Sequence, residues 1–479
     1  MRWGQMKKGT FKPNAKVIYL VMALLASLMH FYKLGSIPYG LHIDEAGMAY
    51  DAFCLANYSV DRYLNHLPVY LVNFGNGQSA LYAYITAILI QLTGNVNPWI
   101  IRLPGAFIGM LGYFSGVAIL RKCMGEKWGL LSSFLLAVFP YFVMQSRFGL
   151  DCNLLLGISS FGIWTLLIAK DKKKMIFFIL SGIVWGVCYY TYALGYLGNT
   201  LFLGIILLYW LYHRKITWRN ALGFGIPILL LVWPLVLMLG INFLGTEDMV
   251  VGPFTIPHLP SFRVSKLGLA NIWERFYTTW KVILTRDDLP YNALDDFYTM
   301  YRISIPFAII GAIRITIDII KDLLHRRYAE EHLLGFLLYA WLIVGILIGY
   351  GPNINRLNGI FLALFFCILY GMRYALNSLQ NWLNKKPVEK DSLKEALLSV
   401  RHLSAKVTGM ILVIYFCCFI SFFHYYFFKY PLDVYPQDFF ADTCKDILDF
   451  IETDTGKPKV NITVRRSRQS GVARATCPD

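Results

Sequence analysis

The stretch "QSALYAYITAILIQLT", residues 78–93, decides how this chain is threaded through a membrane. It is one of twelve apolar runs and among the shortest, with a glutamine towards each end and two tyrosines near its start. A helix needs about 20 residues to cross the hydrocarbon core. We therefore expect residues 78–93 to lie along the membrane surface or to dip in only partway.

The composition is that of a membrane protein. The chain has 479 residues, of which 57% are hydrophobic and 15% are charged, whereas about 25% of residues are charged in a soluble protein. Each crossing run must be helical, because a lone strand cannot satisfy its backbone in lipid. We predict an all-α polytopic membrane protein with eleven transmembrane helices, at 17–34, 98–120, 128–146, 152–169, 175–194, 197–212, 221–241, 303–320, 332–350, 357–376 and 407–427.

The basic loops support the count of eleven. If residues 78–93 also crossed, the basic clusters at 121–127 and 169–175 would lie outside, against the positive-inside rule. Without that crossing every basic loop, including 373–406, lies inside. The N-terminus then lies inside on an uncleaved first helix.

This arrangement defines two regions. Residues 1–427 form the membrane domain, with outer loops at 35–97, 146–153 and 242–302. Residues 428–479 form a small outer α/β segment, in which "QDFFADTCKDILDFIE" predicts a helix and "PKVNITV" the start of a strand. The remaining tail is aperiodic, and we expect the natural outer segment to be longer.

Two features of the composition exclude other classes. The net charge of +16 comes from short clusters between apolar runs, which is typical of cytoplasmic loops and not of nucleic-acid binding. The nine cysteines are scattered, with neither metal-ligand spacing nor a legible disulfide framework.

The first outer loop contains "LHIDEAGMAYDA", residues 41–52. On a helix, Asp44 and Asp51 share one face, while Glu45 points about 100° away. One interpretation is that Asp44 caps a solvated interfacial helix. The other is that Asp44 is a carboxylate base at the lipid surface, facing a substrate delivered from the bilayer.

The second outer loop places Arg147 and Asp151 four residues apart in "MQSRFGLDCN". This spacing allows an ion pair on one helical face. Alternatively, Asp151 is a second acid opposite Asp44, and Arg147 is available for a phosphate.

Two further arginines lie at outer ends of predicted spans. Arg102 is in "WIIRLPGAF" and Arg356 is in "GPNINRLNG". Each can snorkel to lipid headgroups or bind a phosphate through two hydrogen bonds.

The remaining outer residues suggest substrate contacts. Candidates for a sugar site are His42, Asp51, Arg62, His66 and Gln78, although an aromatic interfacial belt has a similar composition. In the loop 242–302, the pairs Asp287/Asp288 and Asp295/Asp296 lack the spacing of a calcium loop. We interpret that loop as a solvated cover over the site.

The distribution of ionisable residues separates the function classes. A coupled transporter carries charged groups deep in its helices, whereas the predicted spans here hold almost none and the acids gather at one surface. An interfacial enzyme is therefore favoured over a transporter, a flippase of lipid-linked glycans or a structural subunit.

In order, these motifs resemble the GT-C class of integral-membrane glycosyltransferases over residues 15–375. An early Asp-Glu pair, a Gln-Ser-Ala-Leu-Tyr helix, an Arg-Leu-Pro span start and a Phe-Pro…Arg…Asp second loop follow one another. The pattern is most similar to family 39, the dolichyl-phosphate-mannose-type protein mannosyltransferases, and to the lipid A aminoarabinose transferase of bacteria.

The resemblance implies an inverting transfer from a polyprenyl-phosphate sugar donor on the outer face of a bacterial plasma membrane. The acceptor is a glycan, lipid or protein. The resemblance assigns catalytic carboxylates to Asp44 and Asp151, with Glu45 completing the pair. A Lys-Pro-Pro element of relatives is replaced here by "FGNGQSALY", which shifts the donor-phosphate contacts to Arg147 and Arg356. No cofactor is implied, and the sequence does not decide whether a divalent metal binds.

Overall fold

The computed structural model describes residues 14–73, 76–260, 268, 271–285, 294–348, 352–384, 393–432, 440–441, 463–466 and 473–476. Its helices are α1 (Ala15–Phe31), α2 (Ile43–Tyr58), α3 (Leu81–Thr93), α4 (Pro98–Met124), α5 (Glu126–Val138), α6 (Pro140–Met144), α7 (Asn153–Lys172), α8 (Met175–Cys188), α9 (Gly195–Tyr212), α10 (Trp218–Leu244), α11 (Ile272–Leu284), α12 (Ser304–Leu324), α13 (His332–Leu347), α14 (Phe361–Asn384) and α15 (Leu393–His424).

The strands are short and pair only in twos within the described residues. The pairs are β1 (Leu41–His42) with β6 (Phe440–Ala441), β2 (Tyr70–Asn73) with β3 (Asn76–Ser79), β4 (Met249–Val251) with β5 (Phe254–Ile256), and β7 (Thr463–Arg466) with β8 (Ala473–Thr476). The long apolar helices and the few short strands confirm the prediction of a mostly helical, multi-pass membrane protein.

All eleven predicted spans coincide with helices. Six described helices are long and apolar enough to cross a membrane, or seven if the bent pair α5–α6 is one span. The helices α1, α3, α8 and α13 are apolar but shorter. The number eleven therefore stays a prediction.

The predicted run 128–146 is broken at Pro140. The helices α5 and α6 meet at an angle of 58°, and Phe139 between them is extended, with φ −70° and ψ 135°. Proline has no N–H to donate to the preceding turn, and it disfavours the helical conformation in the residue before it. The break turns the chain towards the second predicted outer loop.

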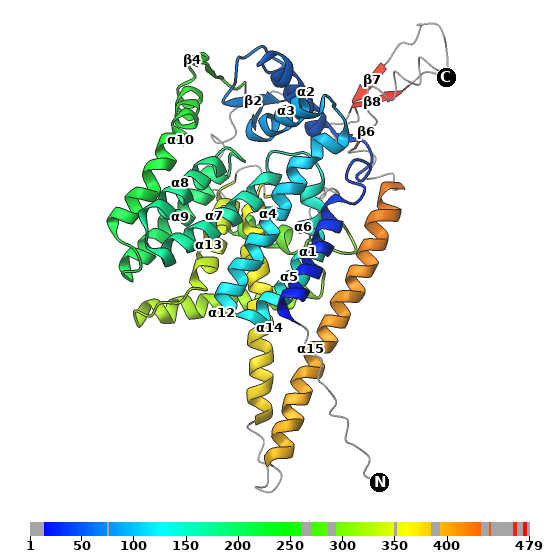
Figure 1. Ribbon diagram of the computed structural model, residues 1–479, viewed down its shortest axis with the longest axis vertical. Coiled ribbons are helices and arrows are strands. Elements are labelled where there is room, and N and C mark those ends of the chain that lie inside the picture. The colour runs from blue at the N-terminus through cyan, green and yellow to red at the C-terminus, as the bar shows by residue number, and fades with distance from the viewer. Residues whose placement is uncertain are drawn as a thin grey trace, which may run out of the picture.

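The helices form one bundle, with the segment that contains α2, α3 and β2 lying over one end of it (Figure 1). At the opposite end, α14 and α15 extend beyond the other helices (Figure 1). The prediction of a loop over 373–406 is wrong for most of its length, because α14 continues to Asn384 and α15 begins at Leu393.

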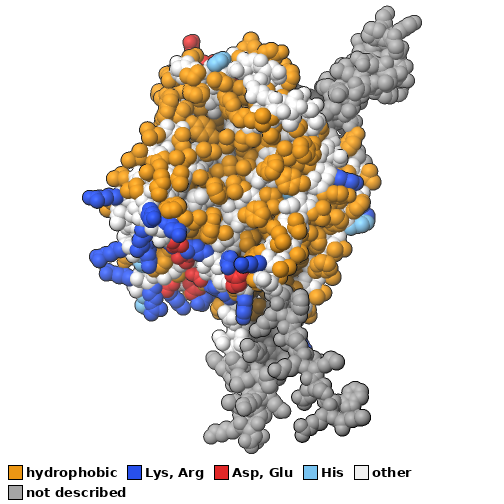
Figure 2. Space-filling view, viewed as in Figure 1, with side chains coloured by type: hydrophobic (Ala, Val, Ile, Leu, Met, Phe, Trp, Pro, Cys, Tyr) orange, Lys and Arg blue, Asp and Glu red, His pale blue; other side chains and the backbone are white. Residues whose placement is uncertain are grey.

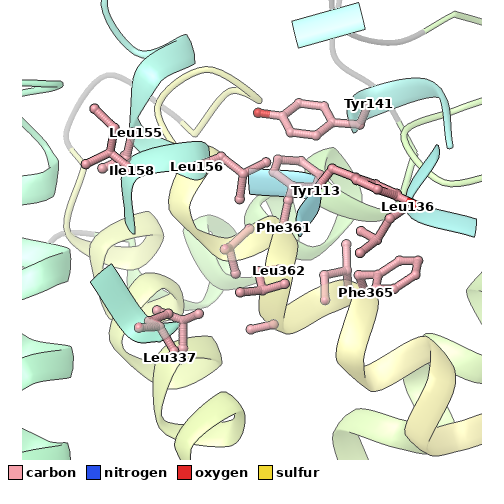
Figure 3. Packing of buried hydrophobic residues seen from close by; sticks show 14 of the residues in the cluster. Tyr113, Leu136, Tyr141, Leu155, Leu156, Ile158, Leu337, Phe361, Leu362 and Phe365 are labelled. Atoms are coloured by element: carbon pink, nitrogen blue, oxygen red, sulfur yellow. The ribbon is translucent and has the colours of Figure 1, made fainter. Parts of the chain in front are cut away.

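Close helix crossings hold the bundle together. A Cβ atom on Gly311 of α12 would lie 1.8 Å from the carbonyl oxygen of Cys367 on α14, so only glycine fits there. Nearer the centre, the rings of Tyr141 and Phe361 stack with centroids 3.5 Å apart. Figure 3 shows this apolar packing around Tyr113, Leu136 and Phe365.

The surface separates by chemical type. A broad hydrophobic band covers the middle of the visible face, and Lys and Arg side chains gather at its lower left (Figure 2). The segment with α2 and α3 lies at the other end of the bundle (Figure 1). We call the lysine- and arginine-rich end, which includes the connections 173–174, 213–217 and 325–331, the basic end.

The C-terminal segment is described only in short strands. Residues 440–441, predicted as helix, are a strand paired with β1, and the rest of that predicted helix lies outside the described residues. The strand prediction at "PKVNITV" overlaps β7, and the tail predicted to be aperiodic contains β8.

Candidate active site

The first and second predicted outer loops are joined by hydrogen bonds. The N–H of Gly149 donates to Glu45 Oε1 at 2.7 Å. The N–H of Ser79 donates to Asp151 Oδ2 at 2.9 Å. Because Ser79 and Gly149 lie at the same end, the chain between them traverses the bundle an even number of times. The helix α4 and the pair α5–α6 supply two traverses, so α3 does not traverse it, in keeping with the prediction for residues 78–93.

Two other connections reach the same end. Asn358 Nδ2, just before α14, donates to the carbonyl of Cys152 at 2.5 Å. The backbone of β5 bonds to the first loop. The Thr255 N–H donates to the His66 carbonyl at 3.0 Å, and the Thr255 carbonyl accepts from the Val69 N–H at 2.9 Å. The three predicted outer loops and the connection before α14 thus meet around one site.

Glu45 is paired with Arg102 inside the protein. Arg102 Nε donates to Glu45 Oε1 at 2.9 Å, and Nη2 donates to Oε2 at 3.0 Å. Arg102 also donates to the carbonyls of Leu34, Pro38 and Gly40 at 3.2, 2.8 and 2.5 Å. Both side chains are fully buried. This geometry gives the pair a structural role and leaves no Arg102 N–H for a donor phosphate.

Arg147 is also buried and serves the end of α1. Its guanidinium donates to the carbonyls of Met29, His30 and Tyr32 at 2.8, 3.0 and 2.7 Å. A cation at a helix C-terminus is favourable, because the last carbonyls carry partial negative charge. The predicted ion pair between Arg147 and Asp151 is not among the salt bridges of the described residues. Arg147 therefore anchors α1 in this conformation.

Asp44 differs from its neighbour Glu45. Its side chain is 40% exposed, and Asn73 Nδ2 donates to Oδ1 at 3.0 Å. The basic side-chain nitrogen nearest to it in the described part of the chain is His42 Nδ1, 3.9 Å from Oδ2, and this nitrogen accepts the Asp44 N–H and is therefore uncharged. Asp44 therefore keeps an oxygen open to solvent, without an arginine or lysine partner among those residues.

Asp151 is held by the hairpin and by its own turn. The Ser79 N–H donates to one oxygen of this carboxylate. The N–H of Cys152 donates to the other, Asp151 Oδ1, at 2.8 Å. The carboxylate is 8% exposed. Two N–H donors stabilise its charged form.

The β2–β3 hairpin connects the two carboxylates. Asn73 on β2 binds Asp44, and Ser79 on β3 binds Asp151. Asn73 pairs in register with Asn76, which lies three residues before Ser79 on β3. At about 3.3 Å per residue, the two contacts are about 10 Å apart along the strand.

Several polar atoms around the hairpin are buried without a hydrogen-bond partner in the described residues. They are Asn73 Oδ1, Gln78 Oε1, Ser79 Oγ and the hydroxyl of Tyr196. The Tyr196 hydroxyl interacts electrostatically with Asp151. Unpaired buried polar groups are rare and call for an explanation such as a bound polar ligand.

The other candidates near α2 are part of its framework. The His42 side chain accepts from the Asp44 N–H at 3.2 Å, and the His42 N–H donates to Glu45, which together form a capping box. Asp51 is buried and accepts two side-chain hydrogen bonds from Arg62, at 2.9 and 2.7 Å. These contacts orient the start of α2 and hence Asp44.

The remaining candidates differ in position. His66 is exposed and its Nδ1 hydrogen-bonds with the Pro253 carbonyl at 2.8 Å. Arg356 is half-buried, two residues from Asn358, and its N–H donates to Asn353 Oδ1 at 2.8 Å. Because Asn358 binds Cys152, the structure brings the Arg356 loop to the Asp151 turn.

The loop 242–302 is described in part. Trp273 and Tyr277 on α11 are exposed, and Arg302 bonds back to Asp295 and pairs with Asp296. Asp287 and Asp288 lie outside the described residues. Across the residues that the structure describes, no three His, Cys, Asp or Glu side chains are grouped to hold a metal ion.

Sequence reasoning missed Asn73, Ser79, Cys152 and Asn358. Their contacts join segments far apart in the chain. The only sequence signal was the turn-forming "NFGNG" at 73–77, which predicts a hairpin through its glycine and asparagine residues.

Comparisons with known proteins agree with the resemblance. The family model described as dolichyl-phosphate-mannose-protein mannosyltransferase matches residues 78–239, which include Arg102, Arg147 and Asp151 but begin after Asp44. No curated protein sequence matches the chain significantly.

Among solved structures, the chain is similar to ArnT from Cupriavidus metallidurans bound to undecaprenyl phosphate. The identity is 12% and the TM-score 0.50, and the match covers 95% of this chain and 83% of ArnT. The oligosaccharyltransferase of Archaeoglobus fulgidus in the apo form matches at 12% identity and a TM-score of 0.48, over 94% of this chain and 59% of its own. The predicted resemblance to GT-C glycosyltransferases is confirmed.

Proposed function

We propose that this protein is an inverting glycosyltransferase that moves a sugar from a polyprenyl-phosphate donor to an envelope acceptor at the outer face of a bacterial plasma membrane. One observation carries the proposal: Asp44 and Asp151, from separate loops, bind the same hairpin at one end of an apolar helix bundle. The similarity in fold to ArnT, whose structure holds undecaprenyl phosphate, supports this donor class.

Asp44 is the general base in this proposal. Its partly exposed carboxylate takes the proton of the acceptor hydroxyl as the oxygen attacks the anomeric carbon. The bond from that carbon to the donor phosphate breaks, and polyprenyl phosphate leaves with the electron pair. The new bond forms on the opposite face, so the anomeric configuration is inverted. Asn73 orients the base through its hydrogen bond to Oδ1.

Asp151 and the unpaired polar atoms of the hairpin bind the sugar. Gln78 Oε1, Ser79 Oγ and Asn73 Oδ1 are acceptors without donors in the described structure, and sugar hydroxyls are donors. Each hydroxyl bound would satisfy a buried group whose desolvation otherwise costs about 1–3 kcal/mol.

Arg356 is the donor-phosphate ligand that we favour. Arg102 and Arg147 are fully buried, whereas Arg356 is half-buried beside the Asp151 turn. A guanidinium offers two hydrogen bonds to phosphate and stays charged as the leaving group develops negative charge.

The orientation follows from the distribution of charge. The basic end lies opposite the segment with α2 and α3 (Figures 1 and 2). By the positive-inside rule the basic end faces the cytoplasm. The site then faces outward.

The test uses purified protein in liposomes with a panel of radiolabelled, short-chain polyprenyl-phosphate sugars and a lipid and glycan extract of the source envelope. A glycosyltransferase forms a new glycosidic bond and releases one polyprenyl phosphate for each sugar transferred. Movement of intact donor across the bilayer without such bonds would instead identify a flippase. Mass analysis of envelope glycans in a deletion strain then identifies the acceptor.

A further inference from the structure

A cavity lined by basic residues lies at the basic end, away from the candidate active site. It has a volume of about 430 Å³ and lies between the connection from α7 to α8 and the connection from α9 to α10. Its cationic lining residues are Lys173, Arg214, Lys215 and Arg219, and no carboxylate lines it within the described structure. Four positive charges around one cavity favour an anionic ligand.

These cations are not neutralised by neighbouring acids. Lys122 and Lys170, at the same end, form ion pairs with Asp171 and Glu330. Among the described residues no salt bridge joins an acid to a lysine or arginine of the cavity. Lys215 contacts an aromatic ring, since its Nζ lies 4.2 Å from the Tyr328 ring centroid.

The backbone adds to the positive potential. The helices α8 and α10 both begin at this cavity, since Met175 and Asn220 line it. Their N-termini contribute partial positive charge. Lys173 and Arg214 adopt left-handed backbone conformations with φ 54° and 56°, which turn the chain sharply between helices and hold both connections close together.

The cavity lies at the edge of the lipid-facing surface. Directly beside it, Ile176 on α8 and Trp218 and Leu222 on α10 are 53%, 68% and 60% exposed. Exposed apolar side chains on these two packed helices suit acyl chains, and tryptophan is typical of the headgroup level. A ligand with a phosphate and two acyl chains matches both parts of this surface.

We propose that this cavity binds the phosphate of an anionic phospholipid, whose acyl chains lie along α8 and α10. Phosphate oxygens accept hydrogen bonds from Lys173, Arg214 and Arg219. A zwitterionic headgroup binds less well, because its ammonium group meets uncompensated positive charge. The inference does not depend on glycosyl transfer.

The experiment measures lipid binding to the purified full-length protein. The protein is incorporated into nanodiscs of phosphatidylcholine with increasing fractions of phosphatidylglycerol, and bound phosphatidylglycerol is counted by native mass spectrometry. The test variant is Lys173→Gln with Arg214→Gln and Arg219→Gln. The matched control is Lys321→Gln with Arg326→Gln and Arg327→Gln, which removes equal charge from exposed positions at the connection between α12 and α13.

The test variant is expected to lose about 100-fold in affinity for phosphatidylglycerol, since it removes three basic residues that bind one phosphate and each contributes about fivefold. The control is expected to lose much less, because its three residues lie outside the lining of the cavity. Equal affinity in the two variants would overturn the proposal. If the test variant elutes as an aggregate, Arg219→Gln alone is measured against Arg219→Lys, which keeps the charge and should keep binding.

A separate arm distinguishes a lipid from a free anion. Inorganic phosphate is titrated into protein in neutral detergent, with and without phosphatidylglycerol. Weak competition by inorganic phosphate supports a lipid site, because the acyl chains add affinity. Tight binding of inorganic phosphate that phosphatidylglycerol does not displace would contradict it and assign the cavity to a soluble anion.

Discussion

Glu45 and Arg102 form a two-pronged ion pair, with N···O distances of 2.9 and 3.0 Å, at a site that excludes solvent from both side chains. The pair fixes α2 to the N-terminal end of α4. Asp44, the residue before Glu45, is thereby held at the surface of the site while Glu45 is buried beneath it.

Removing the charge of Glu45 should therefore cost stability. Glu45→Gln leaves the Arg102 guanidinium buried without its counter-ion, which costs about 3–5 kcal/mol. We expect a large fall in the thermal unfolding midpoint of the purified protein. Glu126→Gln is the matched control, because its pair with Arg121 is exposed and such pairs contribute less than about 1 kcal/mol. An unchanged midpoint in Glu45→Gln would argue for a catalytic role instead.

The Asn73 side chain should matter for turnover more than for folding. Asn73→Ala removes the hydrogen bond to Asp44 Oδ1. Hydrogen bonds to charged groups contribute about 1.5–3 kcal/mol, so we expect turnover to fall about 10–100-fold at an unchanged unfolding midpoint. Asn57→Ala, which removes an exposed amide on α2, the helix that carries Asp44, should leave turnover unchanged. Equal rates in the two variants would refute this role of Asn73.

The cap at His42 predicts a sensitivity to acid. Burial lowers the pKa of His42, and its neutral side chain accepts the Asp44 N–H. The pKa of His42 is therefore lower in the folded protein than its value of about 6.5 in the unfolded chain. The free energy of unfolding is then highest above about pH 6.5 and decreases as the pH falls through the lowered pKa.

His42→Asn tests this sensitivity, because asparagine caps helices without titrating. Unfolding midpoints are measured from pH 8 to pH 4.5 for both proteins. As the pH falls, the unfolding midpoint of the wild type should decrease more than the midpoint of His42→Asn. Parallel pH profiles would show that His42 titration does not affect stability.

Topology predicts which positions share a side of the membrane. The α3 helix has 13 residues, a length of about 20 Å against a hydrocarbon core of about 30 Å. In sealed vesicles, Asn95→Cys and Glu247→Cys should react with an impermeant maleimide from one side. Lys174→Cys should react from the other. Labelling of positions 95 and 174 from the same side would contradict the arrangement of α3 and α4.

The helices were predictable because hydropathy and length are local properties. Every predicted span is helical over most of its length. The break at Pro140 was not predicted, and proline alone does not mark such a break, because Pro104, Pro227 and Pro234 lie inside continuous helices. The full lengths of α14 and α15 were not predicted. The charged residues in 373–406 lower the hydropathy, which is typical of a loop, but lysine, arginine and glutamate also form helices readily.

The site was predictable in residue type but not in role. Asp44 and Glu45 are adjacent, and only the position of Arg102, 57 residues from Glu45, distinguishes them. Likewise, the carbonyls that bind Arg147 come from α1, up to 118 residues away. Which backbone oxygens surround a guanidinium is set by tertiary packing, which a sequence pattern does not encode.

The most direct test of the central claim is the rate of sugar transfer by purified Asp44→Asn, with the polyprenyl-phosphate sugar and acceptor found for the wild type. We predict a loss of about 100- to 10 000-fold, as expected when a general base is removed, with unchanged affinity for undecaprenyl phosphate. Asp296→Asn, which alters an exposed carboxylate, should retain the full rate. Full turnover in Asp44→Asn would contradict the account.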